Sequence, residues 1–503
     1  MRKKEVRYFF KQNIFASLTQ IFIFIFLLLF NILLARILGP YNFGIFIVVF
    51  SMALMVGMFS DMGLSQVIMR YIGRSVRQKD SGAPSYFRHL FKIKLTMVVA
   101  LSLALYFSSD FLAALLLHDG SLGPMFKIAG LIAAAYSFFI FLDSFFASLN
   151  RYDYSMLTNF ISNASRLLLP VALLIMGFGV LEALYGILAA FLFSLVVAGY
   201  FFSRLFRNTL LKNPKKSVNL AGFDRFLIYS ASIGILITAY NNLDTFILSF
   251  FRSPSEVSFY RTALSVATYT AALLPISGRF LFSAIVALEE QSKEFIKKAF
   301  NKTLRYTIIM AIPAAVGVYL LASKIVVLFY SSEYLPAAPA LALLSPLVFS
   351  TIINVLTLNV LMISGRLKQA LIISAIVLAY STAANIILIP VFGYMAAAFN
   401  ALVMHMLFLS LGIYSCRDII KIRIDFDSLF KTILSSAIMG LFLYALLGQI
   451  DSVLTGGLII AVAVLIYLAM QLAVGGITKS DIELLKNAVP CSLWGPIQRF
   501  CRN

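Results

Sequence analysis

Charged side chains are scarce in this sequence, since Asp, Glu, Lys and Arg together make up 12% of its 503 residues. Apolar residues make up 61%, and the mean hydropathy is +0.94. A soluble domain has roughly 25% charged and 45–50% apolar residues. The shortage of charge therefore excludes an ordinary soluble domain and indicates a chain that lies mostly in the membrane.

Cysteine, histidine and nucleotide-binding motifs are equally scarce. The three cysteines, Cys416, Cys491 and Cys501, fall where the chain is predicted to face the reducing cytoplasm, so no disulfide framework is expected. The three histidines are scattered and form no metal motif. No Gly-x-x-x-x-Gly-Lys-Ser/Thr occurs, which argues against ATP hydrolysis. We therefore expect no catalytic residues, no metal site and no cofactor.

Long apolar runs dominate the sequence instead. A membrane-spanning helix needs about 20 mostly apolar residues, and these runs are too long and continuous for the alternating strands of an outer-membrane barrel. Divided at its short polar breaks, the sequence predicts an all-α, polytopic membrane protein with about fourteen transmembrane helices. We place these helices at 14–36, 42–69, 91–109, 125–148, 155–176, 181–203, 226–250, 257–284, 303–322, 337–361, 369–389, 395–416, 429–447 and 454–472.

The net charge of +20 arises from an uneven distribution of basic residues. If the amino terminus is inside, 34 of the 41 Lys and Arg fall in or beside the inner segments, and five fall on the outer side. Basic residues accumulate in the cytoplasmic loops of membrane proteins. We therefore predict a multi-pass protein of the cell membrane with both termini in the cytoplasm and an even number of helices. This explanation also excludes nucleic acid as a partner.

The two halves of the chain contain similar short segments that are separated by the same number of residues. Gly39–Gly44 resembles Ser253–Ser258 at an offset of 214 residues, and Gly177–Gly179 resembles Val391–Gly393 at the same offset. Two sets of six helices have the same orientation, as in transporters built from parallel repeats. The predicted divisions are an N-lobe at 1–203, a cytoplasmic linker at 204–225, a C-lobe at 226–416, two further helices at 417–476 and an interfacial tail at 477–503.

A polar stripe runs along the predicted helix 155–176. Its members recur at spacings that put them on one face, and they are Ser155, Asn159, Ser162, Asn163 and Arg166. Such a stripe can bond to a neighbouring helix. We favour a water-filled cavity, because an arginine about half-way across the bilayer is hard to accommodate otherwise.

The predicted helix 226–250 contains a carboxylate, Asp244, with Asn241 three residues before it. An intramembrane carboxylate can take up H⁺ or bind Na⁺, and either event would couple transport to an ion gradient. A structural pair with Arg252 or Arg261 is the alternative, and both explanations stay open. Asp244 and Asn241 are the candidate ion-coupling residues.

Arginines recur in or near the membrane helices, where charge is otherwise rare. A guanidinium group pairs bidentately with phosphate and keeps its own charge. A cationic cavity between two lobes would suit an anionic amphiphile whose head crosses the membrane while its tail stays in lipid. The candidate substrate-binding residues are Arg36, Arg166, Arg261, Arg279, Asn159 and Asn163.

Several short motifs together resemble one family. The opening segment Leu34–Gly44, followed by Asp61–Leu64, is similar to the family's opening signature, and Ser253–Tyr260 resembles the start of its second lobe. Ile389–Tyr394 resembles a later landmark. The family is the Wzx-like polysaccharide transporter, or oligosaccharide flippase, branch of the MOP (multidrug/oligosaccharidyl-lipid/polysaccharide) superfamily. Ser258 departs from its pattern, in which a glycine is usual.

The resemblance implies two six-helix lobes around a central cavity that is lined by the first, second, seventh and eighth helices. It implies alternating access and the movement of polyprenyl-pyrophosphate-linked oligosaccharide from the cytoplasmic to the outer leaflet, for polysaccharide export. The expected partners are this substrate, membrane lipids, and H⁺ or Na⁺. We expect a monomer.

Two kinds of alternative remain. A peptidoglycan-precursor flippase and a MATE-type drug exporter belong to the same superfamily, although the opening signature favours the polysaccharide branch. A membrane oligosaccharide polymerase or ligase is an alternative from another class. Such enzymes carry a sizeable outer loop with catalytic groups, whereas the outer segments near 109–124 and 323–336 are short and lack paired acids. We therefore expect a transporter rather than an enzyme.

Overall fold

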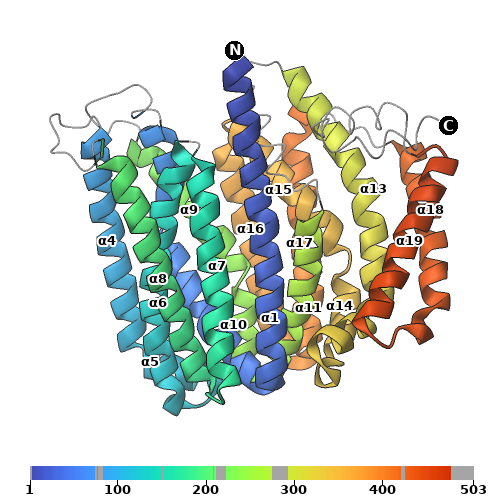
Figure 1. Cartoon of the computed structure of the whole chain (residues 1–503), viewed down its shortest axis with the longest axis horizontal. Coiled ribbons are helices and arrows are strands. Elements are labelled where there is room, and N and C mark those ends of the chain that lie inside the picture. The colour runs from blue at the N-terminus through green and yellow to red at the C-terminus, as the bar shows by residue number, and fades with distance from the viewer. Residues whose placement is uncertain are drawn as a thin grey trace.

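The computed structural model describes residues 3–73, 76, 83–149, 151–207, 209–210, 223–274, 293–420 and 425–476. Within these ranges the chain forms a bundle of helices and contains no β-strand (Figure 1). Its α-helices are α1 (Lys3–Phe59), α2 (Leu64–Val67), α4 (Ala83–Phe107), α5 (Ser109–Leu117), α6 (Gly123–Ser148), α7 (Tyr152–Ile175), α8 (Val180–Phe206), α9 (Phe223–Tyr240), α10 (Leu243–Phe251), α11 (Pro254–Leu273), α13 (Lys293–Ile325), α14 (Ala337–Leu344), α15 (Leu347–Ile363), α16 (Leu367–Phe392), α17 (Tyr394–Ile420), α18 (Phe426–Ala445) and α19 (Val453–Ala473).

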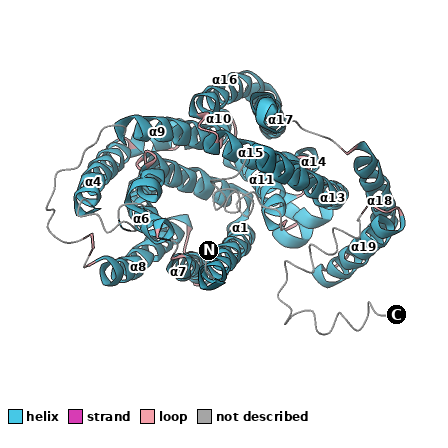
Figure 2. Cartoon of the chain, turned by 90° about the horizontal axis from the view of Figure 1, so that it is seen from above, coloured by secondary structure: helices cyan, strands magenta, loops and turns pink. Residues whose placement is uncertain are grey.

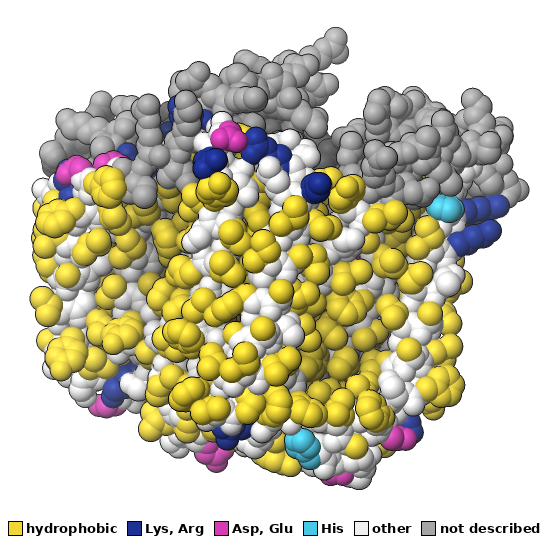
Figure 3. All heavy atoms as spheres, turned by 180° about the vertical axis from the view of Figure 1, so that it is seen from behind, with side chains coloured by type: hydrophobic (Ala, Val, Ile, Leu, Met, Phe, Trp, Pro, Cys, Tyr) yellow, Lys and Arg dark blue, Asp and Glu magenta, His cyan; other side chains and the backbone are white. Residues whose placement is uncertain are grey.

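Eleven helices in the described ranges are long and apolar enough to cross a membrane, and the bent pair α14–α15 would be a twelfth. On the face seen from behind, hydrophobic side chains cover a broad belt, while Lys, Arg, Asp and Glu gather at its two rims (Figure 3). A belt of apolar surface between charged rims matches a bilayer core of about 30 Å. The prediction of an all-α, polytopic membrane protein is confirmed.

The long helix α1 is a hairpin of two membrane helices. At Gly39 the backbone leaves the helical region, with φ 70° and ψ 172°. The ring centroid of Phe30 lies 6.0 Å from those of both Phe46 and Phe50. In a straight helix, residues this far apart in the sequence would be separated by about 24 Å or more along the axis. The chain therefore turns back at Gly39, as the prediction of two separate helices requires.

The predicted helix 226–250 is broken in its middle. It divides at Asn241–Asn242 into α9 and α10. The Asn241 amide donates to the Ile237 carbonyl oxygen at 2.8 Å, and the Asn242 amide donates to that of Thr238 at 2.9 Å. The backbone N–H of Asn241 also donates to the Ile237 carbonyl oxygen at 3.2 Å, and that of Asn242 donates to the Ala239 carbonyl oxygen at 3.1 Å. The predicted helix thus forms one candidate span, Leu227–Phe251, with a break in its middle.

Two other predicted helices are also interrupted. The helix 42–69 stops after Phe59 and resumes as α2 at Leu64. The helix 337–361 bends by 47° between α14 and α15, where Pro346 cannot donate a helical hydrogen bond. Fourteen spans stay a prediction, because α11 is less apolar than its neighbours and 275–292 lie outside the described residues.

The buried apolar side chains of the described residues form one core at one end of the bundle, two cores at the other, and a small fourth cluster among α13, α18 and α19. We call the end where α1 begins the amino-terminal end, and the end where α1 turns at Gly39 the distal end. At the distal end a shared core joins helices of both predicted lobes and includes Phe46, Leu184, Tyr260 and Leu341. At the amino-terminal end, the α4–α8 region and the α13–α17 region keep separate cores.

Close contacts seal the distal end between α1 and the second half of the chain. A Cβ atom added to Gly44 would lie 1.9 Å from the Pro254 carbonyl oxygen, so only glycine permits this approach. The Ser249 hydroxyl donates to the Leu116 carbonyl oxygen at 2.6 Å. The two lobes are therefore closed at the distal end and joined less extensively at the amino-terminal end.

Helices α18 and α19 stand at the edge of the bundle beside α13 (Figure 2). The Tyr467 hydroxyl of α19 donates to the Ile309 carbonyl oxygen of α13, and Gln471 donates to Thr432 of α18 at 3.0 Å. This peripheral position suits the prediction that they are additions to the two lobes. The start of α1 and the end of α19 lie at the same end of the bundle (Figure 1). The lobe divisions remain a prediction, and the tail 477–503 lies outside the described residues.

Gly44→Ala is expected to weaken the distal contact, because the new methyl group would overlap the Pro254 backbone. The reporter is a disulfide between cysteines placed at His118 and Phe250, whose ring centroids are 6.5 Å apart. Overpacking costs about 1–3 kcal/mol, so crosslinking in a chain without native cysteines should slow by about tenfold. Gly199→Ala, which meets nothing within 4 Å, is the control. Equal rates in both variants would contradict the distal closure.

Candidate functional site

Arg166 points into the bundle from α7, with 8% of its surface exposed. Its Nη2 donates to the side-chain oxygen Oδ1 of Asn163 at 2.6 Å. The guanidinium carbon lies 5.5 Å from the ring centroid of Phe30 and 6.0 Å from that of Phe191, in the range of cation–π attraction. Within the described ranges no carboxylate approaches it to 4.0 Å. Arg166 is thus a buried cation that lacks a counter-ion.

The polar stripe that leads to Arg166 is a ladder of hydrogen bonds between α6 and α7. Asp143 accepts from the Ser155 hydroxyl at 2.7 Å and from the Asn159 amide at 3.0 Å. Asn163 donates to the Asn159 carbonyl oxygen at 2.7 Å. In this conformation the ladder joins neighbouring helices near the amino-terminal end, as the helix–helix interpretation predicts. Arg166, at the end of this ladder, makes no ion pair within 4.0 Å among the described residues.

Arg261 lies half-buried on α11, in the other lobe. In the part of the chain that the structure describes, its guanidinium group makes no hydrogen bond or ion pair. Tyr269, two turns further along α11, accepts from the Asn31 amide of α1 at 3.1 Å. The partly buried Tyr269 interacts electrostatically with both Arg166 and Arg261. The two arginines therefore approach one tyrosine from opposite lobes.

Asp244 begins the short helix α10, directly after the break at Asn241–Asn242, and is 4% exposed. Its carboxylate accepts from the Tyr260 hydroxyl and from the backbone N–H of Thr245, the latter at 2.6 Å. Arg261 is close enough to interact electrostatically, without forming an ion pair. Asp244 is thus a buried carboxylate that is held by hydrogen-bond donors.

The proposed structural partner Arg252 lies elsewhere. Its Nη2 donates to the carbonyl oxygens of Pro390 at 2.7 Å and Val391 at 3.1 Å, which ties the start of α11 to the end of α16. A structural pair of Arg252 with Asp244 is therefore not formed. Asn241, the second candidate ion-coupling residue, is exposed at the α9–α10 break and bonds to its own helix.

Two partly buried tyrosines lie within electrostatic range of charged groups in both predicted lobes. Tyr136 of α6 interacts with Arg166 and with Asp61, and Tyr269 interacts with Arg166 and Arg261. We call this series the central array, and in order it comprises Asp61, Tyr136, Arg166, Tyr269, Arg261 and Asp244.

The other two predicted arginines do not join the central array. Arg36 is exposed at the distal end, where its Nε donates to the Tyr330 carbonyl oxygen at 3.0 Å and its Nη2 donates to that of Leu328 at 3.2 Å. In this conformation it holds the Gly39 turn of α1 against the segment after α13. Arg279 lies outside the described residues.

Sequence reasoning missed three members of this region. Tyr136 and Tyr269 sit in apolar helices, where a tyrosine usually serves as a large apolar side chain with a polar tip. Lys94 lies inside the predicted helix 91–109 but was not named as a candidate, whereas α4 begins at Ala83 and buries it completely against Asp61. A signal was present, since Lys94 lies between Ile93 and Leu95 at the start of an apolar run.

The chemistry of the central array favours an anion over a metal ion. Two guanidinium groups from opposite lobes lack carboxylate partners within 4.0 Å across the described ranges, and each can bind a phosphate oxygen pair. No group of three or more His, Cys, Asp or Glu that could hold a metal ion occurs among these residues. A molecule with two linked phosphates would match two separated cations.

Residues 9–286, more than half of the chain, match the sequence profile of the family described as "Polysaccharide biosynthesis protein". The chain belongs to this family. An uncharacterized membrane protein, MJ1068 of Methanocaldococcus jannaschii, is 23% identical over 403 residues, which are 73% of this chain and 76% of that protein. The resemblance stated for the sequence is thus confirmed at the level of the family.

Two solved structures show that this polysaccharide biosynthesis protein has the fold of the MOP superfamily. The inward closed conformation of the lipid II flippase MurJ has a TM-score of 0.72 and 16% identity, over 91% of this chain and 98% of that chain. An inward-facing MATE multidrug transporter has a TM-score of 0.62 and 16% identity, over 78% and 93%. At 16% identity these two structures show the fold of the chain, and the profile match shows its family.

Proposed function

We propose that this protein moves a polyprenyl-pyrophosphate-linked oligosaccharide from the cytoplasmic to the outer leaflet of the cell membrane, for polysaccharide export. One observation supports it most: Arg166 and Arg261, from the two predicted lobes, both lie within electrostatic range of Tyr269, and neither has a carboxylate partner within 4.0 Å in the described ranges. The pyrophosphate would bind between them. Charge-assisted hydrogen bonds to phosphate are among the strong bonds that arginine makes. A bound pyrophosphate would therefore offset the free-energy cost of burying two arginines without counter-ions.

The distribution of cores supports a route for the substrate head group. Among the described residues the predicted lobes share a large core at the distal end and have separate cores at the amino-terminal end, where Leu227 of α9 packs against the core of the α4–α8 region. We therefore infer that they separate at the amino-terminal end. By the predicted topology this end faces the cytoplasm, where the head group would enter. The lipid tail would stay in the bilayer. Release on the outer side requires the contacts at Gly44 and Arg36 to open, and Arg36 would then become free to assist the departing phosphate.

Asp244 supports coupling to an ion gradient. It lies near Arg261, so its negative charge competes with a bound phosphate for the same cation. Binding of H⁺ or Na⁺ at Asp244 would neutralise the carboxylate and leave Arg261 to the substrate. The broken helix α9–α10 resembles the discontinuous helices that form ion sites in transporters. The exposed Asn241 at this break is available as a further oxygen ligand.

The alternatives differ in the ligand that they require. A drug exporter that takes cations would place like charges beside Arg166 and Arg261, which disfavours it here. A peptidoglycan-precursor flippase shares the pyrophosphate chemistry, so it differs only in the sugar. We propose a monomer, because each lobe contributes one arginine to the same site within a single chain.

Arg166→Ala and Arg261→Ala should each abolish glycan export and weaken binding of a polyprenyl-pyrophosphate oligosaccharide to the purified protein by about tenfold or more, the loss expected for a charge-assisted contact. Lys at either position should restore only part of the binding, because it keeps the charge but loses the bidentate geometry. The control is Arg151→Ala, which removes a partly exposed arginine paired with Asp153.

Export is measured in cells that lack the native gene, and binding is measured on detergent-purified protein of normal size-exclusion profile. Undiminished binding in both alanine variants would refute the role of the arginines. Equal binding of a peptidoglycan precursor and of an oligosaccharide-linked lipid, with export of the former only, would favour the rival flippase.

Asp244→Asn should leave substrate binding within about twofold of the wild type and remove the dependence of transport on the ion gradient, because the amide cannot exchange a proton and binds cations weakly. Transport into liposomes is compared with and without imposed H⁺ and Na⁺ gradients. Asp153→Asn, a change at a surface carboxylate, serves as the control. A variant that still responds fully to either gradient would rule out Asp244 as the coupling group.

A further inference from the structure

The second half of α1 ends in a tight turn, Ser60–Gly63, before α2 begins. Met62 and Gly63 both have left-handed backbones, with φ 42° and φ 68°. This region is unfavourable for methionine, so the surrounding contacts must hold it there. The Ser60 hydroxyl is hydrogen bonded to that of Ser137 on α6, which fixes the beginning of the turn.

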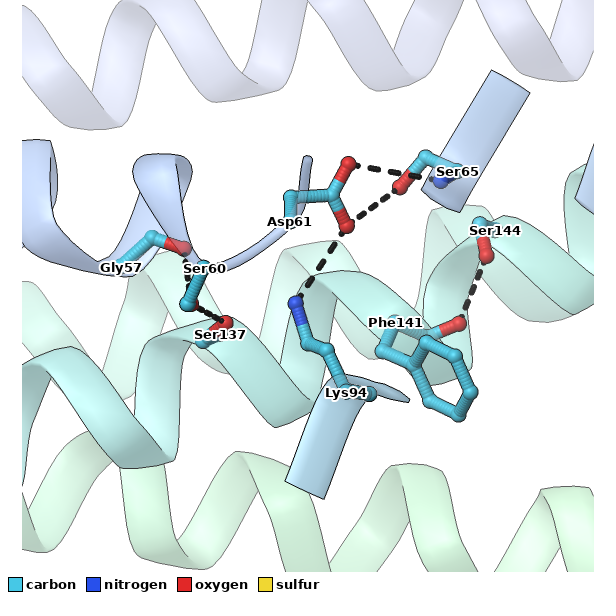
Figure 4. Close-up of polar contacts among 8 residues, drawn as sticks. All are labelled: Gly57, Ser60, Asp61, Ser65, Lys94, Ser137, Phe141 and Ser144. Atoms are coloured by element: carbon cyan, nitrogen blue, oxygen red, sulfur yellow. Dashed lines mark hydrogen bonds and ion pairs between the residues drawn. The ribbon is translucent and has the colours of Figure 1, made fainter. Parts of the chain in front are cut away.

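A buried ion pair holds the middle of the turn (Figure 4). The Asp61 carboxylate accepts from the Lys94 ammonium at 3.3 Å, and from the hydroxyl and backbone N–H of Ser65 at 3.1 and 3.3 Å. The Lys94 side chain is completely buried, and its Nζ lies 5.9 Å from the ring centroid of Phe141. Both charges belong to the N-lobe, so the pair does not depend on contact between the lobes.

The same turn touches the first helix of the C-lobe. A Cβ atom added to Gly63 would lie 2.7 Å from the Ser230 Cβ and 2.8 Å from the Ala231 backbone nitrogen of α9. One turn earlier, the Met58 sulfur lies 3.9 Å from the Thr238 hydroxyl. Backbone thus meets backbone toward the end of the bundle where the lobes otherwise keep separate cores.

We propose that the Asp61–Lys94 ion pair positions the Ser60–Gly63 turn against α9, and that this contact is the amino-terminal gate between the lobes. Because both partners lie in the N-lobe, the pair survives when the lobes separate. The turn then keeps its shape and can re-form the same contact in each cycle. The gating role rests on the proposed function, whereas the positioning of the turn does not.

The test compares crosslinking at the two ends of the bundle in a chain without native cysteines. Cysteines at Met58 and Thr238 report the amino-terminal gate, and those at His118 and Phe250 report the distal contact. Lys94→Met keeps the length of the side chain but leaves Asp61 unpaired. We expect crosslinking at the gate to slow by about tenfold, while crosslinking at the distal pair stays unchanged.

A second variant covers the case in which Lys94→Met does not fold. Asp61→Asn combined with Lys94→Met removes the unpaired charge, and the same slowing confined to the gate is expected. A wild-type rate at the gate in a folded variant would overturn the proposal. Equal slowing at both ends would also overturn it, because the pair would then stabilise the whole bundle. Crosslinking needs no substrate, so failure of pyrophosphate binding would leave this result untouched.

Discussion

The cost of holding cations between two apolar lobes is the constraint on which this structure depends. An arginine at the centre of a membrane helix costs about 2.5–3.5 kcal/mol on insertion scales. Arg166 offsets part of this cost through Asn163 and two aromatic rings. Arg261 remains half-buried without a hydrogen bond or ion pair among the described residues. A protein that keeps such charges unpaired retains a strong preference for an anion.

The closure of the lobes determines when that preference can act. Close backbone packing at Gly44 and the hydrogen bonds of Arg36 seal the distal end, and a single apolar core continues across both lobes there. At the amino-terminal end the cores are separate, and the contact at Gly63 involves few residues. Few contacts mean a small free-energy cost of opening. The arginines are therefore reached most easily from the end that the basic residues predict to be cytoplasmic.

Much of the fold could be predicted from the sequence, because apolar runs in a bilayer have few alternatives to helix. The turn at Gly39 followed from its Gly-Pro signal and the length of the surrounding runs. The breaks at Asn241 and Gly63 could not be predicted in the same way. Hydropathy is an average over a whole span. A break in a helix instead depends on one or two side chains that bond to the backbone, and on a neighbouring helix that packs against the broken segment.

The candidate site was predictable in its charges but not in its connections. Arg166, Arg261 and Asp244 stand out because charge is rare in membrane helices. The electrostatic interaction of both arginines with Tyr269 depends on how the two predicted lobes pack together. The spacing of residues within one helix carries no information about that packing. Lys94 was not named as a candidate for a similar reason: its partner Asp61 lies 33 residues away in the sequence.

The most direct measurement of the central claim is the affinity of purified wild-type protein for three short-chain prenyl ligands that differ only in the head group. If the arginines form a diphosphate site, the pyrophosphate should bind at least about tenfold more tightly than the monophosphate and far more tightly than the alcohol, and added salt should reduce the difference. Equal affinities for the three ligands would show that binding depends on the apolar tail and would contradict the account.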